Sequence, residues 1–99
     1  MHRRIKYAYI RQRKLCEQLG VNVRQLNLIG TEFGLSQLEK NKLLEFVGSP
    51  GFNDGDNLDK LHFLMGFAER DLGMEREQEQ EKFAKAVMEV LFPSLALPF

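Results

Sequence analysis

Tryptophan is absent from this sequence, cysteine occurs once, proline occurs three times, and no apolar run is longer than a few residues. The single cysteine, Cys16, has no partner for an internal disulfide or a thiolate metal site, so we interpret it as a small buried residue. Without a long apolar run we expect no membrane-spanning helix, and the basic amino-terminal stretch is not followed by the apolar segment of a signal peptide. We therefore expect a cytoplasmic protein without a membrane partner.

The sequence also lacks the short motifs that accompany common enzyme chemistry. Neither Gly30 nor Gly34 is followed by a lysine at the spacing of a phosphate-binding loop, and Gly-x-Gly-x-x-Gly, Cys-x-x-Cys and His-Glu-x-x-His are missing. His62 has no second histidine or cysteine at ligand spacing, and the aspartates of residues 54–59 do not follow the pattern of a calcium-binding EF-hand loop. We predict a non-enzymatic protein with no catalytic residue, no cofactor and no metal site.

What the sequence does contain is enough apolar volume for one core. Of its 99 residues 43% are hydrophobic and 28% charged, and eight phenylalanines and two tyrosines supply bulk. This size and composition suit one globular domain. Apolar residues recur at helical spacing, so we predict an all-α, compact single-domain bundle of about five helices with short turns over residues 1–93, followed by an extended tail over residues 94–99.

Capping signals divide the chain into these helices. Asn22 and Gln25, and again Ser36 and Glu39, have the spacing of a capping box that opens a helix. The expected helices cover residues 2–19, 23–33, 36–47, 58–72 and 75–91, and residues 48–57 form the one real loop. Residues 75–82 contain no apolar side chain, so we expect the first two turns of the last helix to project into solvent.

Two apolar features lack an obvious place in the core. Phe63 and Phe67 lie on the helix face nearly opposite the main apolar stripe of residues 58–72, so that helix is either central in its domain or part of an interface. The tail carries Leu95, Leu97 and Phe99 at alternate positions, which suggests that it docks in a groove on its own domain or on a partner.

Charge is segregated along a chain whose net charge is zero. Residues 1–24 contain seven Lys or Arg and one acidic residue, whereas residues 51–99 contain five basic and ten acidic residues. Such polarity favours attraction of the basic end to an anionic partner, or attraction of the two ends within one molecule or between subunits.

Residues 12–31 resemble a helix-turn-helix. Gly20 would form the turn, Cys16 the small position of the first helix, and five residues the apolar contacts between the helices. These five are Leu15, Leu19, Val21, Leu26 and Ile29. A second register is centred on Gly34, but it places Lys40 in an apolar slot.

The resemblance implies DNA binding, in which the second helix enters the major groove. Arg24, Gln25 and Asn27 would then lie near base edges, while Arg11, Arg13 and Lys14 would contact phosphates. Such modules usually dimerise, so a homodimer is also expected under this hypothesis. The neutral total charge argues against it, and so does the lack of a basic arm beyond residue 24.

The alternative hypothesis is a protein adaptor or inhibitor. Aromatic groups flanked by charge are the usual anchors of protein interfaces. The residues that would serve are Arg3, Tyr7, Ile10, Phe63, Phe67, Leu97 and Phe99.

Overall fold

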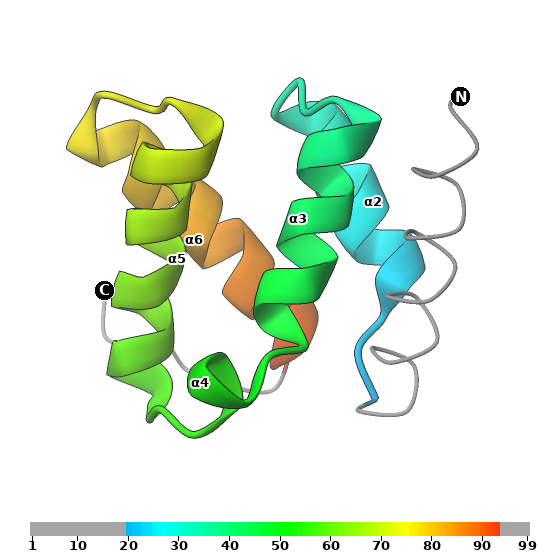
Figure 1. Cartoon of the computed structure of the whole chain (residues 1–99), viewed down its shortest axis with the longest axis vertical. Helices are drawn as coiled ribbons and strands as arrows, with labels where there is room; N and C mark the ends of the chain where they lie inside the picture. The colour runs from blue at the N-terminus through cyan, green and yellow to red at the C-terminus, as the bar shows by residue number, and fades with distance from the viewer. Residues whose placement is uncertain (1–19, 94–99) are drawn as a thin grey trace.

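Five helices occupy the part of the chain that the computed structural model describes, residues 20–93. They are α2 (Val23–Glu32), α3 (Gln37–Val47), α4 (Pro50–Asn53), α5 (Asn57–Leu72) and α6 (Glu77–Leu91), as Figure 1 shows. The predicted all-α fold is confirmed, and the four longer helices match their expected bounds within two residues. The helix expected over residues 2–19 and the tail of residues 94–99 lie outside the described residues.

Helix α6 holds the bundle together because it packs against both α5 and α2. In Figure 1 it runs diagonally behind α3 and α5. Phe83, Ala84, Val87 and Met88 on α6 are fully buried. They meet a buried stripe on α5 and the buried faces of α2 and α3, which together form one core. The other core residues are Val23, Leu26, Leu43, Leu44, Val47, Phe52, Leu61, Leu64, Phe67 and Ala68.

The segment of residues 48–57 is not wholly a loop, and this expectation was wrong. Ser49 begins the one-turn helix α4, with Pro50 at its first position and the Ser49 hydroxyl accepting a hydrogen bond from the Phe52 backbone N–H at 3.4 Å. Proline suits this position because the first helical N–H has no partner within the helix. The turn buries Phe52, which is 3% exposed, so α4 closes the bundle between α3 and α5.

Helices α2 and α5 both end at a left-handed glycine, although the hydrogen bonds that close the two turns span different numbers of residues. Gly34 and Gly73 both adopt left-handed backbone conformations, with φ of 73° and 68°. The next residue then donates its N–H back into the helix, Leu35 to the Gly30 carbonyl at 2.9 Å and Met74 to the Ala68 carbonyl at 3.0 Å. A glycine followed by an apolar residue is the usual sequence of this termination. Each turn therefore directs one apolar side chain back toward the bundle.

The first turns of α6 are mostly exposed, as expected, but Gln80 is an exception. The helix begins at Glu77, and Gln80 is only 6% exposed. The Gln80 side-chain amide donates to the Met74 carbonyl at 2.9 Å and to the Glu69 carboxylate at 3.2 Å. A polar side chain can be buried here because its donors are satisfied. On the same helix, Glu81 and Lys85 form an ion pair one turn apart, at 2.9 Å.

Helix α5 buries one of its two aromatic residues and leaves the other partly free. Phe67 is 2% exposed and its ring centre lies 4.9 Å from that of Phe46 on α3, whereas Phe63 is 39% exposed. Leu58, in the first turn of α5, is 53% exposed. None of the helices within residues 20–93 is long and apolar enough to cross a membrane.

Candidate functional site

An aromatic groove lies between α3 and α4 on one side and α5 on the other. It has a volume of about 330 Å³. Its lining residues are Phe46, Ser49, Gly51, Phe52, His62, Phe63 and Arg70. In Figure 1 the helices that line the groove, α3, α4 and α5, lie at the front of the view.

Tilted aromatic rings form the floor of the aromatic groove. The ring centre of Phe46 lies 5.6 Å from that of Phe52, and the Phe52 ring lies 6.5 Å from that of Phe63. A Cβ atom at Gly55 would lie 2.9 Å from the Phe63 ring, so the missing side chain of this glycine makes room for the ring. Phe63 is therefore held in place from below while its outer face contacts solvent.

The groove continues along α3 into a second hollow of about 370 Å³, which shares Phe46 and Ser49 with it. Here the walls carry charges of both signs, Lys42 and Glu45 from α3 and Asp71 from α5. A floor of aromatic carbon with a mixed-charge rim resembles the composition of protein interfaces, in which an apolar centre is surrounded by polar groups.

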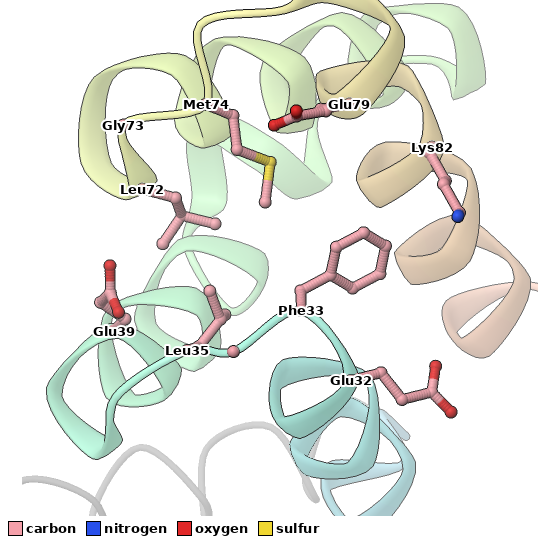
Figure 2. A pocket seen from close by; sticks show the side chains of 10 residues that line it. Glu32, Phe33, Leu35, Glu39, Leu72, Gly73, Met74, Glu79 and Lys82 are labelled. Carbon is pink, nitrogen blue, oxygen red and sulfur yellow. The ribbon is translucent and has the colours of Figure 1, made fainter.

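A second recess, which we call the turn cleft, lies where the two glycine turns face each other. It has a volume of about 450 Å³ and lies between the α2–α3 turn and the α5–α6 turn. Figure 2 shows Phe33, Leu35, Leu72 and Met74 pointing into a common space. All four are partly exposed. The turn cleft thus has an apolar floor made by the residues that flank Gly34 and Gly73.

The rim of the turn cleft is mainly acidic. Glu32, Glu39, Glu79 and Lys82 stand around it in Figure 2. Glu39 also accepts the Ser36 backbone N–H at 2.8 Å in the capping box of α3. Neither Glu32 nor Glu79 forms an ion pair with another residue of the described range. Two carboxylates at this rim are therefore free to meet a cation.

Only the second half of the predicted DNA-binding surface lies within the described residues. Gly20 has the left-handed backbone predicted for the turn, with φ of 79°, and the Asn22 side chain accepts the Gln25 backbone N–H at 3.1 Å. Arg24 and Gln25 are exposed on α2, and Asn27 is partly exposed. Arg11, Arg13 and Lys14 lie outside the described residues, so whether the two halves of the predicted site come together stays a prediction.

The described residues and the segment that precedes them carry opposite net charges. Residues 20–93 contain eight Lys or Arg and thirteen Asp or Glu, a net charge of −5, whereas residues 1–19 contain six and one, a net charge of +5. Helix α2 itself carries one cation, Arg24, and one anion, Glu32. Binding to the DNA backbone draws on clustered cations, and α2 offers a single one.

The register centred on Gly34 corresponds to the observed turn between α2 and α3. Lys40 occupies its apolar slot by laying its aliphatic stem over Gly30, where an added Cβ would lie 2.9 Å from the Lys40 Cγ. The Lys40 ammonium then donates to the Thr31 hydroxyl at 2.7 Å. Long cationic side chains commonly bury the stem and keep the charge in water.

Of the residues expected to contact a protein partner, Phe63 and Phe67 lie within the described part of the chain. Phe63 lines the aromatic groove and is partly exposed, but Phe67 is a core residue and the expectation that it is an exposed anchor was wrong. Its ring is covered because α3 places Phe46 against it. Arg3, Tyr7, Ile10, Leu97 and Phe99 lie outside the described residues.

Sequence reasoning missed the residues that form most of both recesses. Phe46 lies on α3 and Phe52 on α4, and no local sequence pattern predicts that these helices pack on α5. For Leu35 and Met74 a signal exists, because each directly follows a glycine that ends a helix.

Residues 20–93 contain no group of three or more His, Cys, Asp or Glu side chains placed to hold a metal ion. In comparisons with protein-family models, with curated proteins and with solved structures, we found no match to this chain.

Proposed function

We propose that this chain is a non-catalytic protein-binding module whose aromatic groove receives an apolar side chain from a helix of a partner protein. The observation that supports this function best is Phe63, which is 39% exposed at the mouth of a groove floored by Phe46 and Phe52. Aromatic side chains held rigidly at the centre of a patch typically supply most of the binding energy of an interface.

The shape of the groove favours a helical partner. Two helices form its walls, and an amphipathic helix commonly lays its apolar face into a groove of this kind. Burying one leucine or phenylalanine of the partner among the rings would contribute about 1.5 to 3 kcal/mol. The charges at the rim, Lys42 and Arg70 with Glu45 and Asp71, would select a partner that carries both signs beside its apolar anchor.

Affinity capture with three versions of the chain tests this function. Wild type, Phe63→Ser and Leu28→Ser are immobilised, and the proteins that each retains from cell extract are identified by mass spectrometry. Leu28 is the matched control because it is 58% exposed on α2, away from the groove. We expect one protein to be retained by wild type and Leu28→Ser and reduced about tenfold or more by Phe63→Ser.

Equal retention of that protein by Phe63→Ser and wild type would contradict a role for the groove. Helix content measured by circular dichroism must be the same in all three versions, because a misfolded variant also loses partners.

DNA binding is the second candidate, and one observation favours it. The left-handed Gly20 is followed by the Asn22 cap and by exposed Arg24 and Gln25, the arrangement expected for the start of a recognition helix. In this function Arg24, Gln25 and Asn27 would contact bases, and Arg11, Arg13 and Lys14 would contact phosphates.

Titration with a random duplex at two salt concentrations tests the second candidate. Affinity must fall steeply as salt rises if several phosphates are contacted, and Arg24→Ala should weaken binding while Arg76→Ala, at an exposed cation beside α6, should not. No binding at low salt removes this function and leaves the protein-binding module.

A further inference from the structure

We infer that the turn cleft binds the basic segment of residues 1–19 from a second copy of this chain. This inference is independent of the aromatic groove and of DNA binding, because it rests on a different recess. It concerns an interaction surface between copies and the segment that occupies it.

The floor of the turn cleft sets the first requirement on its occupant. Phe33, Leu35, Leu72 and Met74 leave partly exposed apolar carbon around a space of about 450 Å³. Such a space accommodates one large apolar side chain, and the flexible thioether of Met74 can adapt to its shape. The Phe33 ring is fixed by an edge-to-face contact with Phe83, 5.4 Å between ring centres, so the floor is anchored in the core.

The rim sets the second requirement. Glu32 and Glu79 have no cationic partner among the described residues, and Glu39 adds a third carboxylate against the single cation Lys82. An apolar anchor flanked by cations therefore complements the cleft, whereas an acidic segment would be repelled.

Residues 1–19 have this composition. Tyr7 and Ile10 are flanked by Lys6 and Arg11, and the segment carries a net charge of +5 against −5 for residues 20–93. Opposite net charges of this size attract the segment to the cleft, and the mass of the chain in solution distinguishes a contact between copies from one within a single molecule. If each copy offers one segment and one cleft, the contact is reciprocal, as in a twofold-symmetric dimer.

The mass of the full-length chain in solution, measured by light scattering, tests this inference. At about 0.01 M salt, where the screening length is roughly 30 Å, we expect the mass of a dimer. At about 1 M salt, where it is roughly 3 Å, we expect a monomer. A monomer at low salt would overturn the inference.

Charge reversal identifies the two surfaces. The cleft variant Glu32→Lys/Glu79→Lys and the segment variant Arg11→Glu/Arg13→Glu should each be monomeric at low salt. Asp54→Lys/Glu89→Lys, which changes net charge as much as the cleft variant at exposed positions outside the cleft, should remain dimeric. A dimer that persists in the cleft variant, or that is lost equally in the control, would show that the contact lies elsewhere.

Mixing the cleft variant with the segment variant is the decisive step. Both contacts of the mixed pair are then complementary in charge, so the dimer mass should return. A mixture that stays monomeric, although each variant keeps its helix content, would overturn binding between copies and would instead indicate attraction within one molecule.

Discussion

The α2–α3 and α5–α6 hairpins are built by the same local device but differ in what they expose. In both, a left-handed glycine ends the first helix and an apolar residue after it turns back toward the bundle. The second helix of one hairpin begins with the Ser36 capping box, whereas the N-cap residue of α6, Arg76, provides no side-chain cap. The two hairpins are therefore similar in the turn that connects their helices.

Packing makes them different. The facing residues of α5 and α6 include Leu64, Ala68, Phe83 and Ala84, all fully buried. The α2–α3 hairpin buries one side on α6 but leaves Leu28 58% and Leu38 50% exposed, and it contributes one wall to each recess. The close packing of α5 on α6 indicates that this hairpin carries most of the stability. Both hairpins line the two recesses, and the proposed anchor Phe63 belongs to α5.

The largest expected effect is a loss of stability when the packing of α6 on α5 is disrupted. Phe83→Ala removes a fully buried ring at the centre of α6 and should lower the free energy of unfolding by about 3 to 5 kcal/mol. Urea denaturation followed by circular dichroism measures the change. Phe33→Ala, at its half-buried neighbour on the other hairpin, should cost only about 1 to 1.5 kcal/mol. Equal losses would contradict the larger share of stability assigned to the α5–α6 hairpin.

A smaller effect tests whether the shared turn device matters equally in both hairpins. Gly34→Ala and Gly73→Ala place a side chain in open space but at positive φ, so each should cost about 1 to 2 kcal/mol from backbone strain alone. Gly51→Ala is the control. It lies in helical α4 with no atom within 4 Å of the added Cβ, and it should stabilise the protein by about 0.5 to 1 kcal/mol. Midpoints of thermal unfolding compare the three.

The smallest effect concerns the solvent side of α6. Glu81→Gln removes the 2.9 Å ion pair with Lys85, whose side chain is one-third exposed, and should cost about 0.2 to 0.5 kcal/mol. High salt should abolish the difference from wild type, because salt screens exposed charges. A difference that persists at high salt would mean that Glu81 acts through packing.

The helices could be predicted because their signals are local. Ser36 with Glu39, and Asp56 with Asp59, form complete capping boxes in the structure, and Gly34 and Gly73 end helices. Position 80 was misjudged because the Gln80 partners, Glu69 and the Met74 carbonyl, belong to another helix and a turn. Phe63 and Phe67 share one helix face, so no spacing rule could say that α3 would cover only one of them.

The sequence by itself determined the helical class, the bounds of the four longer helices and the separation of basic from acidic residues, since each depends on neighbours along the chain. Only the tertiary structure decided that Phe67 is buried while Phe63 is exposed, and that two distant glycine turns face each other across an apolar cleft. These outcomes depend on how α3, α5 and α6 pack together. That packing is set by the joint burial of many side chains rather than by any one stretch of sequence.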